Sequence, residues 1–121
     1  MKDDTKDNFL DVLVGEKLSS VTFVMDYLQA DFDGNGFTFY IWPVVTVDNI
    51  EYRFGVPLYR DKLCSLITRV VDYLIFLDGK GMVIHFDNYD KLFLPLDPSN
   101  PDIVAEIGIF TAANGDLYVF E

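Results

Sequence analysis

Apolar and polar residues alternate along many short segments of this chain, a pattern typical of half-buried β-strands. The alternation covers residues 21–26, 28–33, 37–42, 74–76, 82–86 and 92–96. Further apolar runs, at 44–47, 50–54, 106–110 and 117–120, are typical of strands in hairpins. Asp48-Asn49 between two of these runs predicts a tight turn. The pattern as a whole predicts a largely antiparallel sheet.

Two segments show helical spacing of their apolar residues. Phe9 and Leu13 lie four residues apart, Thr5 can cap the helix that carries them, and Gly15 suits the position just after its end. The apolar residues within 63–70 also follow helical spacing. We therefore expect a short helix at each of these places.

The order of these elements repeats along the chain. Residues 9–34 and 59–88 both run from a helical segment into alternating strands, and Val21 and Phe23 then match Leu74 and Phe76. The repetition predicts a single α+β domain over residues 1–121. We expect it to contain an internally duplicated helix–β-meander–hairpin unit, at about 5–57 and 58–121, with two helices on one face of a largely antiparallel sheet.

The chain of 121 residues is strongly acidic, with 20 acidic and 9 basic residues and a formal net charge of −11. Proteins that bind nucleic acid need a basic surface, so we expect no nucleic-acid partner. An anionic membrane surface is disfavoured for the same reason. A basic protein would be attracted to this chain, although acidity also serves simply to keep an aromatic-rich protein in solution.

The sequence carries no sign of export. Cys64 is the only cysteine, which excludes an intrachain disulfide. Residues 1–18 are acidic and lack the apolar run of a signal peptide, and no stretch is long enough to span a membrane. We therefore expect a cytoplasmic protein.

The stretch DFDGNG, residues 31–36, resembles the start of a calcium loop. Asp31, Asp33, Asn35 and Gly36 stand where such a loop has its first oxygen ligands and its glycine. The twelfth position, which needs a bidentate Glu, holds Trp42. Because both flanks alternate like strands, we interpret the stretch as a hairpin turn and expect no metal site.

His85 is the only histidine and is the main candidate for catalysis. The alternation places it on the strand face opposite Ile84, but no neighbouring residue in the sequence would set its tautomer. It could activate Cys64 as a nucleophile. Cys64 borders an apolar helical stripe, however, and such a cysteine is usually a small core residue.

A broader alternative is a small-ligand or metal-dependent enzyme that uses His85 together with aspartates. The candidate aspartates are Asp26, Asp31, Asp33, Asp72, Asp78, Asp87 and Asp90. Most of them fall at predicted turns, where aspartate is favoured by turn geometry alone. The chain has no CxxC, no HExxH and no glycine-rich phosphate loop, so the sequence favours a non-enzymatic role without a cofactor.

Several aromatic residues fall on the strand faces opposite the main apolar set. They are Tyr27, Tyr40, Trp42, Tyr73 and Phe93. One interpretation is a second buried layer beneath helices or hairpins. The other is an exposed aromatic patch, which is typical of protein interfaces.

Three stretches carry a resemblance to known proteins: LVGEKLSSVTFVMDYLQADFDG, YRDKLCSLITRVV and PDIVAEIGIF. Together they resemble a group of small uncharacterised bacterial cytoplasmic proteins. That group has no activity to transfer, so no residue inherits a role from it. In size and acidity, but not in motif, the chain is also similar to bacterial immunity proteins, which neutralise a toxin by binding it.

These observations favour a non-enzymatic protein-interaction module, of the immunity or antitoxin kind, that binds a basic protein. The expected contact residues are Trp42, Tyr40, Tyr27, Asp31 and Asp33. The enzyme that uses aspartates and His85 is the first alternative. A structural homodimer, with the aromatic face as its interface, is the second.

Overall fold

The structure, a computed structural model, describes residues 11–77, 80–95, 108–115 and 117–120. In chain order these residues form the 3-10 helix η1 (Asp11–Leu13), the strands β1 (Ser20–Val24), β2 (Tyr27–Phe32), β3 (Asn35–Phe39), β4 (Val44–Val47) and β5 (Ile50–Tyr52), the helix α2 (Tyr59–Cys64), and the strands β6 (Val71–Leu77), β7 (Gly81–Phe86), β8 (Lys91–Pro95), β9 (Gly108–Thr111) and β10 (Leu117–Phe120).

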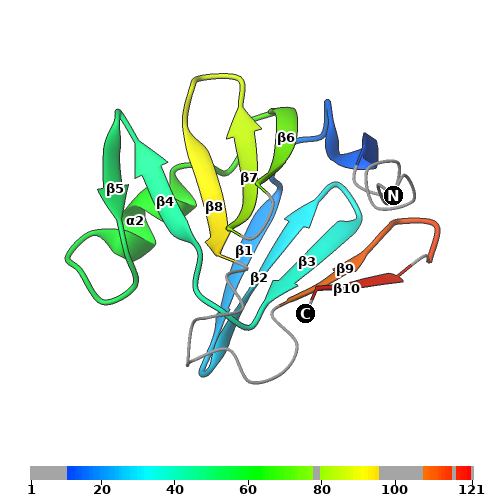
Figure 1. Cartoon of the computed structure of the whole chain (residues 1–121), viewed down its shortest axis with the longest axis horizontal. Helices are drawn as coiled ribbons and strands as arrows, with labels where there is room; N and C mark the ends of the chain where they lie inside the picture. The colour runs from blue at the N-terminus through cyan, green and yellow to red at the C-terminus, as the bar shows by residue number, and fades with distance from the viewer. Residues whose placement is uncertain (1–10, 78–79, 96–107, 116, 121) are drawn as a thin grey trace.

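The strands form two antiparallel sheets (Figure 1). The first sheet has the order β1-β2-β3-β9-β10, and the second sheet has the order β5-β4-β8-β7-β6. Inward-facing side chains from both sheets belong to one hydrophobic cluster. The described residues therefore form a mostly β structure in which two layers share a core.

The predicted α+β fold, with a duplicated helix–meander–hairpin unit and two helices on one face, is wrong. In the described part of the chain α2 is the only α-helix and has six residues, while η1 has three. The helix expected to continue to residue 70 ends at Cys64. Thr68 has a left-handed φ of 84°, and the Leu18 N–H then donates to the Arg69 carbonyl (2.9 Å), so this stretch joins the sheet region. Thr5 and Phe9 lie outside the described residues.

Alternation decides which side chains enter the core. Every second residue of the central strands points inward and is buried, since successive side chains of a strand face opposite ways. The buried set from these strands comprises Leu28, Ala30, Phe32, Phe37, Phe39, Met82, Ile84, Phe86, Leu92, Leu94 and Phe110. Burying one large side chain of this kind contributes about 1.5–3 kcal/mol, so this set supplies much of the force that holds the layers together.

Two-residue turns close two of the hairpins. Asp33-Gly34 joins β2 to β3 with φ values of 53° and 98°, and Asp48-Asn49 joins β4 to β5 with φ values of 53° and 66°. Positive φ at both positions is the geometry of turns that match the twist of a hairpin, and Asp, Asn and Gly tolerate it. The predictions of turns at DFDGNG and at Asp48-Asn49 are confirmed.

Each sheet combines a three-stranded meander from one half of the chain with a hairpin from the other half. The β4–β5 hairpin pairs with β8, and the β9–β10 hairpin pairs with β3. Equivalent registers recur, since Val21 pairs with Ala30 in the first sheet and Leu74 pairs with Ile84 in the second. The division into sequence repeats at 5–57 and 58–121 stays a prediction.

The two sheets are also joined at one corner. Lys17 and Val70, just outside β1 and β6, form an isolated antiparallel bridge. The helix α2 packs against β4 of the second sheet and β1 of the first, with Tyr59 and Leu63 buried. The helix therefore links the two layers. None of the described helices is long and apolar enough to cross a membrane.

Candidate functional site

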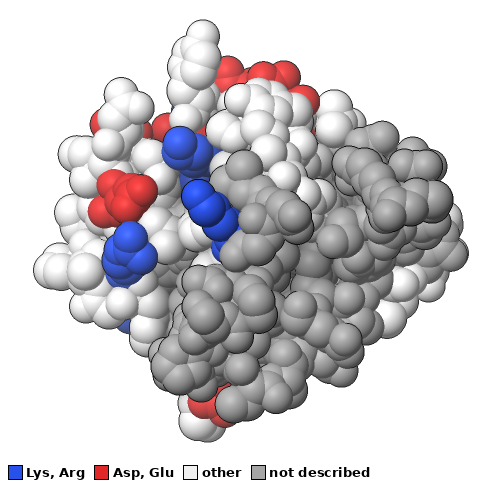
Figure 2. All heavy atoms as spheres, viewed as in Figure 1, with Lys and Arg blue, Asp and Glu red and all other residues white. Residues whose placement is uncertain are grey.

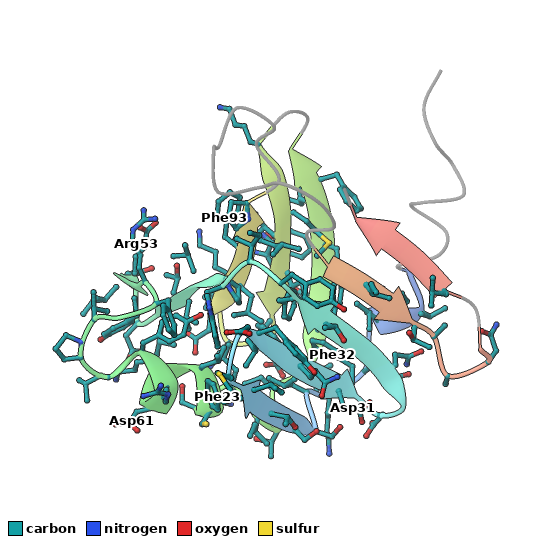
Figure 3. The ribbon with its side chains drawn as sticks, turned by 90° about the horizontal axis from the view of Figure 1, so that it is seen from below. Phe23, Asp31, Phe32, Arg53, Asp61 and Phe93 are labelled. Atoms are coloured by element: carbon teal, nitrogen blue, oxygen red, sulfur yellow. The ribbon has the colours of Figure 1, made fainter. Side chains whose placement is uncertain are left out.

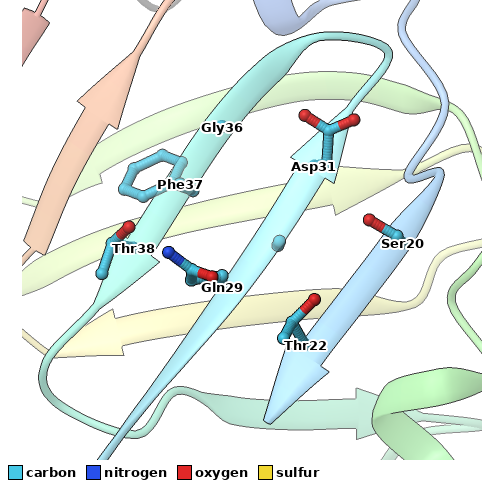
Figure 4. Close-up of a pocket in the computed structure, with 8 residues that line it drawn as sticks. Ser20, Thr22, Gln29, Asp31, Gly36, Phe37 and Thr38 are labelled. Carbon is cyan, nitrogen blue, oxygen red and sulfur yellow. The ribbon is translucent and has the colours of Figure 1, made fainter. Parts of the chain in front are cut away.

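The outer face of the first sheet is mostly polar (Figure 4). A shallow hollow of about 220 Å³ lies over β1, β2 and β3. Its lining residues are Ser20, Thr22, Gln29, Ala30, Asp31, Gly36, Phe37 and Thr38. Asp31 is the only charged side chain in this lining, so the hollow favours a cation or a hydrogen-bonding group over an anion.

Asp31 and Asp33 lie at the end of this face where β2 turns into β3. The Asp31 carboxylate accepts hydrogen bonds from the Ser19 hydroxyl (3.0 Å) and the Gly34 N–H (3.2 Å). The Asp33 N–H donates to the Ser19 hydroxyl oxygen (3.2 Å), and Asp33 itself is exposed. Asp31 thus orders the turn as well as contributing charge, whereas the carboxylate of Asp33 is open to solvent.

Tyr27 and Tyr40 lie at the opposite end of the same strands. Leu28 pairs with Phe39 in the register of β2 and β3, which makes the two tyrosines neighbours. Their ring centroids are 5.6 Å apart at a tilt of 57°, and 39% of Tyr40 is exposed. The structure therefore brings these two expected contact residues together and separates them from Asp31 by the length of the strand.

Trp42 does not join this tyrosine pair. Its ring stacks on Phe54 with a centroid distance of 4.2 Å and meets the edge of Tyr59 at 6.5 Å. Trp42 is half-buried and packs against the core, while the Tyr59 hydroxyl donates to the buried Pro43 carbonyl. Burial raises the pKa of the Tyr59 phenol well above its usual value. Trp42 is therefore part of an aromatic cluster beside α2.

The other outward aromatic residues lie on the second sheet. Tyr73 is 44% exposed and stacks on His85 with a centroid distance of 4.2 Å and an interplanar angle of 11°. Phe93, on the outer side of β8, is half-buried. Apart from Trp42, the aromatic residues that the sequence placed on one kind of face are thus divided between two separate outer faces.

His85 faces outward, as its alternation predicts, and its ring stacks on Tyr73. Burial lowers the pKa of its imidazole, the charge of Lys91 lowers it further, and Asp72 partly offsets this. Cys64 is exposed on α2, which corrects the expectation of a small core residue.

Metal binding needs several oxygen, nitrogen or sulfur ligands at one point. The described part of the chain contains no group of three or more His, Cys, Asp or Glu residues that could hold a metal ion. Asp78, one of the candidate aspartates, lies outside the described residues. The enzyme alternative that uses aspartates and His85 stays a prediction.

A second hollow, of about 370 Å³, lies on the outer face of the second sheet. Its lining residues are Val44, Thr46, Glu51, Arg53, Ile75, Val83, His85, Lys91 and Phe93. Sequence reasoning missed this set apart from His85 and Phe93. The alternation KLFLP in β8 does place Lys91 and Phe93 opposite the buried Leu92 and Leu94, but only the sheet order brings Arg53 to the same face.

Comparison with known proteins gives no match: no protein-family model, no curated protein and no solved structure is significantly similar to this chain. The resemblance to small bacterial cytoplasmic proteins therefore stays a prediction.

Proposed function

We propose that this protein is a non-enzymatic protein-interaction module that binds a basic protein partner through the outer face of its first sheet. The observation that carries the proposal is the arrangement of that face. Tyr27 and Tyr40 form a ring pair at one end, Asp31 and Asp33 place carboxylates at the other, and no basic side chain lines the hollow between them.

This arrangement suits a basic surface for two physical reasons. Tyrosine supplies large, stiff contact area with a polar tip, and it is enriched in protein interfaces. The carboxylates complement lysine and arginine side chains, and a net charge of −11 accelerates encounter with a positively charged protein. Inhibition of the partner would then be steric, as in immunity proteins or antitoxins.

Site-specific cross-linking in the host cell tests the proposal. A photoreactive phenylalanine analogue replaces Tyr40 in one variant and Tyr89 in a control, because Tyr89 is 90% exposed but lies in the β7–β8 turn of the other sheet. We expect a basic protein to cross-link at position 40 and not at position 89. The cross-linked protein is identified by mass spectrometry.

Charge removal makes the same test quantitative. Asp33→Asn removes an exposed carboxylate at a position whose left-handed φ asparagine tolerates, so the turn should survive. Asp87→Asn is the matched control in the corresponding turn of the second sheet. We expect the first change, but not the second, to lower the yield of cross-linked partner. Equal cross-linking at positions 40 and 89, or none at position 40, would contradict the proposal.

Self-association is the second candidate, and the loop between β5 and α2 favours it. Three large apolar side chains on this loop are about half exposed: Phe54, Val56 and Leu58. Clustered exposed apolar side chains mark interfaces. Leu58→Asn removes one of them and suits the left-handed φ of 71° there. Light scattering should show a dimer that this change dissociates, and a monomer at every concentration would rule the dimer out.

A further inference from the structure

The hollow on the outer face of the second sheet differs in chemistry from the one on the first sheet. Four of its lining residues are apolar, and they come from β4, β6, β7 and β8: Val44, Ile75, Val83 and Phe93. Val44 and Val83 are buried and Phe93 is half-buried. A floor of this kind suits the hydrocarbon body of a ligand. The volume of about 370 Å³ lies at the lower end of the range for small-molecule sites.

Cationic groups lie around this apolar floor, in a chain whose net charge is −11. Lys91 and Arg53 both line the hollow, and Lys91 makes no ion pair in the described part of the chain. Arg53 has only a 3.4 Å contact with Glu51, and both of these side chains are well exposed. Figure 2 shows basic side chains gathered on this side of the molecule, over β4, β5 and β8. Exposed ion pairs are weak, so a ligand can compete for Arg53.

The two outer faces lie on opposite sides of the molecule. Arg53 and Phe93 are on one side in Figure 3, and Asp31 is on the other. A ligand on the second sheet therefore does not share a surface with the proposed protein contact. Binding at the second sheet is accordingly independent of the proposed function.

We infer that the hollow over β4, β6, β7 and β8 binds a small amphipathic organic anion, namely a carboxylic acid with an aryl or alkyl body. The body lies on Val83 and Phe93, and the carboxylate pairs with Lys91, with Arg53 as a second cation. The apolar floor alone would accept any hydrophobic molecule. The two cations select the anion, because the carboxylate replaces water around charges that lack a strong partner.

His85 gives a built-in signal for this site. It lines the hollow and is the only histidine, so the imidazole C–H resonances in a proton NMR spectrum belong to it without further assignment. The charged or titratable groups near it are Lys91, Asp72 and the stacked Tyr73, with Glu51 and Arg53 elsewhere in the lining. A bound carboxylate adds negative charge beside the imidazole and should raise its pKa.

The experiment compares three probes that share one body: 4-phenylbutyrate, 4-phenylbutanol and 4-phenylbutylamine. Each is titrated into the full-length protein while the His85 resonances are followed. We expect 4-phenylbutyrate to shift them saturably and to raise the pKa of His85. The alcohol should bind about fivefold more weakly, because an ion pair at a partly exposed site contributes about a fivefold gain in affinity. The amine should bind more weakly still, because its positive charge is repelled by Lys91 and Arg53.

Two charge variants locate the cation responsible. Lys91→Gln should weaken the binding of 4-phenylbutyrate about fivefold, to an affinity close to that of 4-phenylbutanol. Lys62→Gln is the matched control, because Lys62 lies on α2 over the Tyr52 ring and does not line the hollow. If Lys91→Gln disturbs the fold, the comparison of the three probes on the unaltered protein still decides the question.

Three results would overturn the inference. One is the absence of any His85 shift with 4-phenylbutyrate up to about 10 mM. A dissociation constant above that concentration would be too weak for a specific small-molecule site. Another is equal affinity for the acid and the amine, which would mean that the cations do not select the ligand. The third is an equal loss of affinity in the Lys91 and Lys62 variants, which would show a general charge effect.

Discussion

The carboxylate of Asp90 accepts a hydrogen bond from the main-chain N–H of Asp48 (3.3 Å), 42 residues earlier in the chain. Asp90 is buried, and its second oxygen accepts from the Asn88 side-chain amide (2.8 Å). In the first sheet the Asn35 side-chain oxygen accepts in the same way from the Ala113 N–H (2.9 Å). Each sheet thus ties its meander to the hairpin from the other half of the chain through one buried polar side chain.

Asp90→Ala should lower the free energy of unfolding by about 1–3 kcal/mol. The change leaves the Asp48 N–H and the Asn88 amide without their acceptor. Partly buried donors that lose their acceptor destabilise a fold by about this amount. Urea denaturation followed by circular dichroism measures the change. Asp87→Ala, in the same turn but exposed, should change the free energy by less than about 0.5 kcal/mol. Equal losses would mean that the link between the two turns adds no stability.

Gly81→Ala should be more harmful than Gly36→Ala. A Cβ at position 81 would lie 2.3 Å from the Leu94 carbonyl oxygen and 2.8 Å from the Phe93 ring, at a φ of 154°. A Cβ at position 36 meets no atom within 4 Å. Because β7 and β8 must separate to admit the methyl group, we expect a loss of about 1–3 kcal/mol for Gly81→Ala and little or no loss for Gly36→Ala. Thermal melts of the two variants compare them directly, and similar melting temperatures would contradict this packing.

Trp42→Ala should destabilise the fold by about 2–4 kcal/mol, because a large half-buried ring leaves the core and its stack on Phe54. The sequence pattern alone predicts instead that this change affects binding and leaves the fold intact. Met25→Ala, at a side chain that is 90% exposed, is the control and should be close to neutral. Urea denaturation measures both, and a near-neutral Trp42→Ala would restore this residue as a candidate for a surface contact.

Phe54→Ala should shift the fluorescence of the only tryptophan to longer wavelength. Phe54 covers one face of the Trp42 ring at 4.2 Å, so its removal exposes the indole to water. The emission spectrum of the folded variant reports this in one measurement. Leu58→Ala, on the same loop but without a ring contact to Trp42, should leave the emission maximum where it is.

The imidazole of His85 should titrate below its ordinary value of 6.5. Burial and the charge of Lys91 both disfavour the protonated form, so Lys91→Gln should raise the pKa and Asp72→Asn should lower it further. The native state then binds this proton less tightly than the unfolded chain. The contribution of neutral His85 to the free energy of unfolding is therefore complete above about pH 6.5, and it is lost as the pH drops through the lowered pKa. NMR titration of the single histidine checks each shift, and a pKa at or above 6.5 would show that burial and Lys91 do not dominate.

Local pattern alone predicted the strands and two of their turns. The alternation of Leu28, Ala30 and Phe32 predicts one buried face, because side-chain direction repeats every two residues in a strand whatever the strand pairs with. Asp33-Gly34 and Asp48-Asn49 read as turns because these residues tolerate positive φ. Both signals act over a few neighbouring residues, so no tertiary contact is needed to recognise them.

The same kind of pattern failed where a distant contact outweighed it. Residues 63–70 have helical spacing, yet the helix ends at Cys64 because the segment around Arg69 pairs with Leu18, about fifty residues away. Backbone pairing across the chain satisfies N–H and C=O groups that a continued helix would have satisfied internally. Helix propensity, which is worth only tenths of a kcal/mol per residue, cannot decide between the two.

The sequence by itself therefore determined which segments are strands, which of their faces is apolar, and where Asp31 and His85 stand on those faces. Only the tertiary structure decided that the β4–β5 hairpin joins β8, that Trp42 packs inward while Tyr40 stays outside, and that Arg53 and Lys91 line one hollow. The physical reason is that side-chain alternation is a property of one strand. The partner of a strand depends on which burial of apolar surface and which set of backbone hydrogen bonds is best for the whole chain.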